Sequence, residues 1–268
     1  MGMCEKPSAI SHQPSGKTFG GHGRDQGTRI AIVAAMKKEI APLVRGWSAR
    51  KIVHEGRTFE IFETGDAGGY RAIAICGGIG AEAARRAAEA VVREAEPARV
   101  VSVGFAGALD SKMKIGDVIE ARVVVNASDG SRTDTGSGQG TLLSCWAVAD
   151  RDQKKRLAAA YRADAVDMEA AAVAQAAQAH GLEFAALKAI SDAVDFSMPP
   201  VHRFVSGDGR FRSASFALHV AVRPWLWKRT ITLARNSERA IRALCVAIVK
   251  YLNRRTVAVE LSHVVAGR

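Results

Sequence analysis

Short runs of apolar residues recur along the chain and predict the strands of a buried sheet. Residues 29–35, 100–104 and 184–190 are mainly apolar, as expected of strands that are covered on both faces. Residues 58–64 and 70–76 form a hairpin-like pair, because turn glycines separate them. The chain therefore contains enough strand-forming segments for a sheet.

Other segments carry apolar residues at helical spacing. Residues 81–96 are rich in alanine and stop before Pro97, and residues 168–180 end at Gly181. Ser237 is a candidate N-cap for a last helix. The apolar face of that helix would consist of Ile241, Leu244, Cys245, Ile248 and Leu252. Strands that alternate with helices predict an α/β fold with a mostly parallel, helix-covered sheet.

The chain divides into three parts by pattern. Residues 1–28 are polar and glycine-rich without a hydrophobic period, which predicts a disordered leader. Residues 29–198 hold the predicted α/β domain, and within it residues 126–140 are polar enough to be a loop. Residues 199–268 are expected to form a basic, aromatic-containing helical extension packed on the same domain.

Charge is unevenly distributed along the 268 residues. The net charge is +11, and residues 203–255 alone contain twelve Lys or Arg against two acids. This basic segment raises the hypothesis of a nucleic-acid-binding protein, although it contains no recognisable base-reading motif. An apolar content of 48% is ordinary for a globular domain, so most of the chain should fold around a core.

Cysteine and histidine usage argues against disulfide bonds and metal sites. The cysteines are widely separated, without a Cys-x-x-Cys pair or a secretory signal, which indicates free thiols in a reducing cytoplasm. No histidine lies at ligand spacing from another histidine or a cysteine, so no metal is expected. Charges interrupt every long apolar stretch, and the protein is expected to be cytoplasmic, either soluble or peripheral on the inner membrane face.

Three carboxylates follow predicted strands, where ligands bind in open α/β sheets. Glu39 lies after the first strand, Asp192 follows the run at 184–190, and Glu169 opens the helix at 168–180. Each has a structural alternative. Glu39 and Glu169 could simply complement a helix dipole, and Asp192 could serve an Asx turn. The glycine turn at 77–80 could admit an anion or a water, or could serve only as a tight turn.

Five short motifs occur in a recognisable order. They are Ile32-Val33-Ala34-Ala35-Met36-Lys37-Lys38-Glu39, Gly77-Gly78-Ile79-Gly80, Gly104-Phe105-Ala106-Gly107-Ala108-Leu109 with Gly116-Asp117, Val166-Asp167-Met168-Glu169-Ala170, and Ala189-Ile190-Ser191-Asp192. Through them, residues 29–195 resemble the methylthioadenosine/S-adenosylhomocysteine nucleosidases of the purine nucleoside phosphorylase superfamily. The resemblance implies a three-layer αβα phosphorylase-like fold, with a mostly parallel mixed sheet and helices on both faces. It also implies a homodimer without a cofactor, unless phosphate is a co-substrate.

The resemblance gives roles to these residues. Asp192 would protonate or hydrogen-bond N7 of the adenine, and Glu39 would position or deprotonate the attacking water. Glu169 would hold the ribose hydroxyls while Met168 packs on the sugar. The remaining substrate contacts are expected from Gly78, Phe105, Ala106, Gly107, Ala147 and Val148.

Two departures from the family concern the substrate. An aromatic residue is usual at the position of Ala147, so Trp146 or Phe105 would have to stack on the base instead. The segment 126–140 is shorter than in the family, which implies a more open 5′ side of the pocket.

The C-terminal part resembles the hopanoid-associated branch of the superfamily. The residues concerned are Pro199-Pro200-Val201-His202-Arg203-Phe204-Val205, Gly207-Asp208-Gly209 and Arg223-Pro224-Trp225-Leu226-Trp227. That branch implies removal of adenine from adenosylhopane, a lipid. Trp225 and Trp227 beside Lys228 and Arg229 would suit an anionic membrane surface, and a solvated basic helix hairpin is the alternative.

The function predicted from the sequence is therefore cleavage of the N-glycosidic bond of a 5′-substituted adenine nucleoside. Hydrolysis is favoured because Glu39 suits water and the glycine turn at 77–80 carries no cation, although Arg85 could reach a phosphate. Phosphorolysis and the salvage of methylthioadenosine or S-adenosylhomocysteine remain alternatives. Outside enzymes, a nucleic-acid-binding protein or a catalytically inactive nucleoside-binding module remains open.

Overall fold

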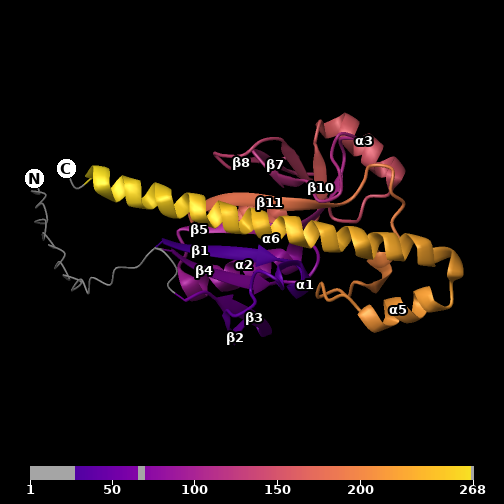
Figure 1. Cartoon of the computed structure of the whole chain (residues 1–268), viewed down its shortest axis with the longest axis horizontal. Helices are drawn as coiled ribbons and strands as arrows, with labels where there is room; N and C mark the ends of the chain where they lie inside the picture. Colours follow the sequence, from indigo (N-terminus) through magenta and orange to yellow (C-terminus); the bar gives the residue numbers. More distant parts are fainter. Residues whose placement is uncertain (1–27, 66–69, 267–268) are drawn as a thin grey trace, which may run out of the picture.

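The fold is described from a computed structural model of the chain, which defines residues 28–65 and 70–266 (Figure 1). Apart from Thr28, the predicted leader at 1–28 lies outside the described residues. The turn glycines Gly68 and Gly69 lie outside them as well. Of the four cysteines, Cys76, Cys145 and Cys245 are free thiols in the described part of the chain.

One mixed sheet forms the centre of the molecule. Its strands are β1 (Thr28–Ala34), β2 (Ser48–His54), β3 (Arg57–Glu63), β4 (Tyr70–Cys76), β5 (Arg99–Ala108), β6 (Val118–Glu120), β7 (Val123–Asn126), β8 (Arg132–Asp134), β9 (Thr141–Ser144), β10 (Ala165–Asp167) and β11 (Glu183–Asp192). The main order is β2-β3-β4-β1-β5-β10-β9-β7-β8, and β11 pairs with β5 and β6. Strands β4, β1, β5 and β11 run parallel, so their carboxyl ends share one edge.

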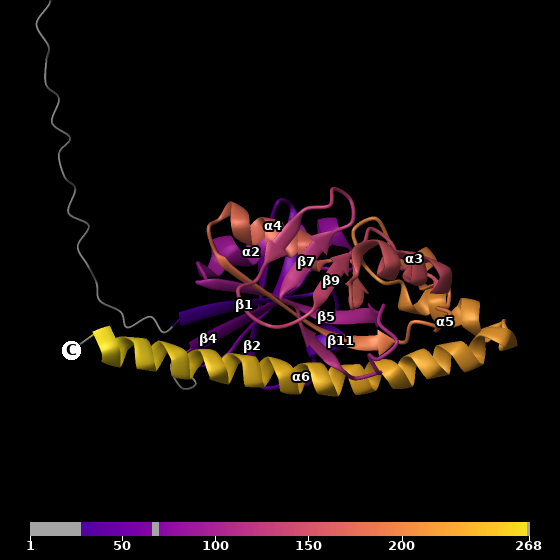
Figure 2. The ribbon, with the colours of Figure 1, turned by 90° about the horizontal axis from the view of Figure 1, so that it is seen from above.

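Helices cover both faces of this sheet, and Figure 2 shows the three layers from above. On one face lie α2 (Ala81–Ala95) and α4 (Ala170–Ala179), and on the other lie α1 (Lys37–Ile40) and the long α6 (Pro224–Ala266). Alternate residues of β1 point into the two layers: Ile30 and Ile32 face α6, while Ala31 and Val33 face α2. The predicted three-layer αβα class is confirmed.

The last helix begins earlier than the sequence pattern predicts. It starts at Pro224, a residue that fits the first helical turn because its missing N–H would be unpaired there, and Ser237 lies inside the helix rather than at its cap. The central part of the predicted apolar face is buried, as expected. The buried residues of this face are Ala240, Leu244, Cys245, Ile248, Tyr251 and Leu252.

The segment at 126–140 was predicted to be a loop, and this prediction is wrong for part of it. Residues 132–134 form β8, which pairs antiparallel with β7 at the edge of the sheet. Only one face of an edge hairpin packs against protein, and the side chains of Arg132 and Asp134 are exposed. A strand with this composition carries no apolar signal, which explains why the sequence pattern missed it.

Three further helical segments lie near the carboxyl edge of the sheet. They are α3 (Arg151–Tyr161), the 3₁₀ helix η1 (Val201–Phe204) and α5 (Ser213–Ala221). In Figure 2, α3 and α5 lie beyond the tip of β11. None of the described helices combines the length and the apolar character that crossing a bilayer requires.

Candidate active site

A cavity of about 190 Å³ lies at the carboxyl edge of the parallel strands. It receives residues that follow β1, residues from the end of β5 and the last residue of β11. All but one of the predicted site residues line it. They are Glu39, Phe105, Ala106, Gly107, Ala147, Val148, Met168, Glu169 and Asp192. Acids that are far apart in the sequence therefore share one pocket, as expected of an open α/β sheet.

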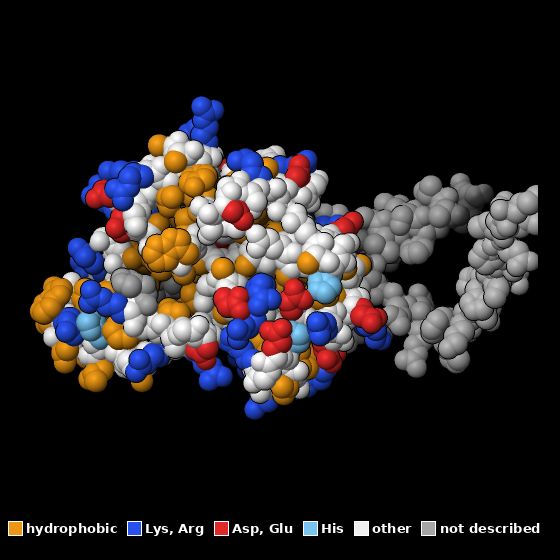
Figure 3. Space-filling model, turned by 180° about the vertical axis from the view of Figure 1, so that it is seen from behind, with side chains coloured by type: hydrophobic (Ala, Val, Ile, Leu, Met, Phe, Trp, Pro, Cys, Tyr) orange, Lys and Arg blue, Asp and Glu red, His pale blue; other side chains and the backbone are white. Residues whose placement is uncertain are grey.

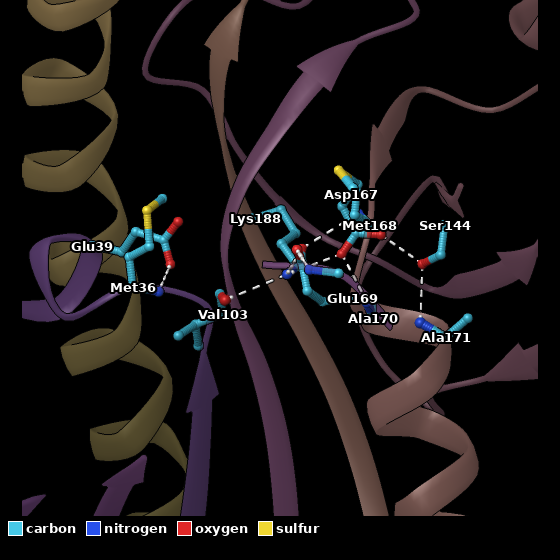
Figure 4. Close-up of polar contacts among 11 residues, drawn as sticks. Met36, Glu39, Val103, Ser144, Asp167, Met168, Glu169, Ala170, Ala171 and Lys188 are labelled. Atoms are coloured by element: carbon cyan, nitrogen blue, oxygen red, sulfur yellow. Dashed lines mark hydrogen bonds and ion pairs between the residues drawn. The ribbon is translucent and has the colours of Figure 1, made fainter. Parts of the chain in front are cut away.

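Glu39 comes from α1, directly after β1, and only 2% of its surface is exposed. Its Oε2 accepts a hydrogen bond of 3.1 Å from the backbone N–H of Met36 (Figure 4). Burial raises the pKa of Glu39 to about 7 and the negative charge of Glu169 adds to this, although the Met36 N–H and Lys188 oppose the shift. A carboxyl with this pKa can accept a proton near neutral pH.

Glu169 is held by the glycine turn. Its Oε1 accepts a hydrogen bond of 2.9 Å from the N–H of Gly80, and its Oε2 accepts one of 3.3 Å from the N–H of Met168. Burial raises the pKa of Glu169, and the Lys188 ammonium opposes that shift. The carboxylate is thus fixed by backbone donors at the start of α4.

The other amides of the glycine turn also donate to protein oxygens. The N–H groups of Gly77 and Gly78 donate to Ala34 and Ala35, and that of Ile79 donates to the carbonyl of Gly209. Their acceptors belong to the fold, so the turn packs the chain rather than presenting amides to an anion.

Gly78 is the predicted site residue that the structure does not bring to the cavity wall. Its φ is +107°, and a Cβ there would lie 2.9 Å from the carbonyl oxygen of Gly209. Glycine is required because the turn packs directly on the loop around Gly209. Gly78 therefore has a packing role next to the cavity and does not line it.

Lys188 is a buried cation that the sequence pattern did not identify. Its Nζ lies 3.0 Å from Oδ2 of Asp167 and 4.0 Å from Oε2 of Glu169, and it donates to the Val103 carbonyl at 3.3 Å (Figure 4). Burial lowers the pKa of Lys188, but the two carboxylates outweigh burial and hold the pKa above its usual value. The feature of the sequence that could have identified Lys188 was its charge within an otherwise apolar central strand.

Gly104 makes room for this group of charges. A Cβ at this position would lie 3.3 Å from Oε2 of Glu39 and 3.5 Å from Nζ of Lys188. Asp167 is satisfied from the other side, where the Ser144 hydroxyl donates to it at 2.5 Å and the Ala170 N–H donates at 2.8 Å. The Glu39 and Glu169 carboxylates therefore lie around one buried ammonium.

Lys154 is the second cation that was not predicted. It comes from α3, lines the cavity, and forms an ion pair with Asp192, whose other oxygen accepts a 2.7 Å hydrogen bond from Ser191. The available signal was the capping box of α3, in which Asp150 accepts hydrogen bonds from the N–H groups of residues 152 and 153.

An aromatic residue does reach the cavity, but it is Phe105 rather than Trp146. Phe105 lines the cavity beside Ala147, whereas the side chain of Trp146 is 82% exposed and does not line it. Of these two aromatic residues, only Phe105 is therefore placed where it could stack on a bound base.

Among the described residues, no group of three or more His, Cys, Asp or Glu side chains could hold a metal ion. The charges in the cavity belong instead to carboxylates and ammonium groups. This composition suits proton transfer and the binding of hydroxyl groups.

A sheet with helices on both faces and an acid-lined cavity at its carboxyl edge defines the class of the protein. The model for the phosphorylase superfamily matches residues 29–152 and 147–208. The chain therefore belongs to the phosphorylase superfamily, and it is an enzyme of that superfamily.

Individual relatives agree with this assignment. A 5′-methylthioadenosine/S-adenosylhomocysteine nucleosidase from Actinobacillus succinogenes is 28% identical over 62% of this chain and 86% of its own length. The nucleosidase of the same name from Helicobacter pylori has a similar fold, with a TM-score of 0.65 and 18% identity over 85% of this chain and 99% of that one. The futalosine hydrolase of Helicobacter pylori gives a TM-score of 0.60 and 20% identity over 84% and 98% of the two chains.

Proposed function

We propose that the protein cleaves the N-glycosidic bond of a 5′-substituted adenine nucleoside and releases adenine. The observation that carries this proposal is that Glu39 and Asp192 line one cavity from two different strand ends. A leaving base needs an acid, and a weak nucleophile needs a base. The Actinobacillus succinogenes relative bears the name of such a nucleosidase.

Each acid has one task in this proposal. Asp192 gives a proton or hydrogen bond to N7 of the adenine, so that the ring withdraws electrons and the bond to C1′ breaks. Glu39 takes a proton from the water that attacks C1′. Glu169 binds the ribose hydroxyls, and Met168, which lines the same cavity, packs against the sugar.

Hydrolysis is the reaction that the contacts favour. The amides of the glycine turn at 77–80 donate to protein oxygens, and Arg85 forms an ion pair with Glu82 and does not line the cavity. The pKa of Glu39, about 7, suits a base that activates water. Lys38 does line the cavity, so a role for phosphate must be tested directly.

The substrate that fits best carries an apolar 5′ substituent. The chain after residue 197 contributes several apolar side chains to the cavity, namely Met198, Val201, Phe211 and Leu233. Such a wall favours a hydrocarbon over a charged amino acid, because burying a charge without a partner is costly. We therefore place adenosylhopane, in hopanoid biosynthesis, ahead of methylthioadenosine and S-adenosylhomocysteine.

A lipid substrate would require contact with a membrane, and the end of the molecule formed by α5 and the start of α6 suits this. Trp225 is 71% and Trp227 is 49% exposed, and exposed Lys228 and Arg229 follow them. At the left end of Figure 3, hydrophobic side chains lie among Lys and Arg. Aromatic and basic residues together favour an anionic membrane surface over nucleic acid, so the proposed location is the cytoplasm with peripheral membrane contact.

The second proposed partner is another copy of the chain. The proposal of a homodimer rests on the family resemblance, and mass measurement in solution tests it. A mass of one chain at micromolar concentration would overturn it.

Adenine release from a panel of nucleosides tests the proposed function. The panel contains methylthioadenosine, S-adenosylhomocysteine and a lipid-linked adenosine, each with and without phosphate. We expect release without phosphate, fastest from the lipid-linked substrate. Strict dependence on phosphate would replace hydrolysis by phosphorolysis, and no release from any substrate would overturn the activity.

A further inference from the structure

Lys154 brings a buried ammonium group to the proposed catalytic acid. Only 1% of its surface is exposed, and its Nζ pairs with Oδ2 of Asp192 and donates to the Ala193 carbonyl at 2.8 Å. A Cβ on Gly107 would lie 2.8 Å from Oδ2 of Asp192 and 3.2 Å from Nζ of Lys154. The glycine in β5 thus leaves space for the pair at the cavity wall.

This pairing creates a chemical problem for acid catalysis. In an ion pair the transferable proton is on the lysine, and the carboxylate has none to give. A leaving adenine, however, must take a proton or a strong hydrogen bond at N7. Lys154 already donates to Oδ2 of Asp192, so it can supply that proton within the buried pair.

We propose that Lys154 is the proton source for the leaving group and that Asp192 passes this proton to the base. This inference rests on the proposed function. Lys154 acts as a positioning and proton-supplying residue because it acts through Asp192. Before the reaction its N–H groups donate to the Asp192 carboxylate and position it. During bond cleavage one of them gives a proton to that carboxylate.

The step balances in atoms and charge. The C1′–N9 bond breaks and its electron pair enters the purine ring. Lys154 gives one N–H proton to the Asp192 carboxylate and becomes a neutral amine, and the carboxyl group so formed passes a proton to N7 and becomes a carboxylate again. The attacking water forms the new bond to C1′ and loses a proton to Glu39. Lys154 then regains a proton from solvent and Glu39 releases one, so that both groups return to their starting state.

Other charged groups share the cavity and must be separated from this effect. Lys38, Glu39, Asp167 and Glu169 line it, and Lys188 lies behind Asp167. Glu39, whose pKa is about 7, must lose its proton to act as a base and so gives the acid limb of a rate profile. The alkaline limb reports on the supply of a proton to the leaving base. The two limbs can therefore be assigned separately.

Two substitutions of Lys154 test the proposal, with adenine release measured across pH. Lys154→Arg keeps a positive partner for Asp192 but cannot give up a proton, because a guanidinium stays protonated. Lys154→Gln removes the charge, so that Asp192 must take its proton from solvent. The neighbouring Lys155, which is exposed on α3, provides matched controls as Lys155→Arg and Lys155→Gln.

We expect Lys154→Arg to lower kcat by about 100-fold or more while adenine still binds and the Tm changes little. We expect Lys154→Gln to lose activity at lower pH than the wild type does, so that its rate profile narrows on the alkaline side. The Lys155 variants should behave as the wild type.

A wild-type kcat in Lys154→Arg would overturn the inference. It would show that the site needs only a positive charge next to Asp192 and not a group that gives up a proton. An alkaline limb unchanged in Lys154→Gln would overturn it as well, even if the arginine variant does not fold. Wild-type protein that releases no adenine from any substrate would instead overturn the proposed function, and this inference with it.

Discussion

The backbone N–H of Gly80 donates a 2.9 Å hydrogen bond to Oε1 of Glu169. The glycine turn before α2 and the acid before α4 are therefore parts of one arrangement, although they are distant in the sequence. The turn fixes a carboxylate in the cavity, and the amides of Gly77, Gly78 and Ile79 are bound to the fold. This arrangement favours water over phosphate as the nucleophile.

The raised pKa of Glu39 predicts a dependence of stability on pH. Its pKa is about 7 in the folded protein against 4.5 ordinarily, so between these values the folded state binds more protons than the unfolded chain. Stability contributed by this group is therefore lost as the pH rises through that window, by about 3 kcal/mol at most. Glu39→Gln, which has no proton to lose, should remove this contribution.

Urea denaturation of the wild type and Glu39→Gln at pH 5 and pH 8 measures this effect. The variant should gain stability relative to the wild type at the higher pH. An equal difference between the two proteins at both pH values would contradict the raised pKa.

Lys188 should be essential for folding stability. Lys188→Met leaves the Asp167 and Glu169 carboxylates buried without their shared cation, and we expect a loss of about 3–5 kcal/mol in the free energy of unfolding. Lys37→Met is the control, because Lys37 pairs with Glu60 on the surface and such pairs contribute about 1 kcal/mol or less. Similar losses in both variants would contradict the role of Lys188.

The exposed tryptophans of α6 should govern membrane contact. Replacing Trp225 and Trp227 by alanine should lower co-sedimentation with anionic liposomes several-fold, because their rings would lie at the interface. Trp146→Ala removes a tryptophan near α3 that is 82% exposed, and it should leave partitioning unchanged. Equal partitioning of all three proteins would favour a solvated helix hairpin.

The parts of the site that could be predicted from the sequence follow buried strands. Glu39 and Asp192 were predictable because apolar runs place them at the carboxyl ends of parallel strands, where side chains converge. Helix α3 was not predicted, since its residues 151–156 are all polar or charged and its one buried residue is Lys154. Lys154 was missed with the helix that carries it.

The start of α6 was misplaced for a related reason. Residues 224–236 are mostly exposed or half-buried, so no continuous apolar stripe marks these turns. A hydrophobic pattern reports only the part of a helix that packs, and Leu244, Ile248 and Leu252 pack on the sheet. The pattern thus identified the packed half of the helix and not its full length.

Replacement of the proposed acid tests the central claim most directly. Asp192→Asn preserves the shape of the side chain but cannot carry the proton, and Asp195→Asn alters an exposed acid three residues away. Adenine release at pH 7 is the measurement, with the Tm as a check on folding. The account predicts that Asp192→Asn lowers kcat by about 100-fold or more while Asp195→Asn stays near the wild type. A folded Asp192→Asn protein that releases adenine at the wild-type rate would contradict it.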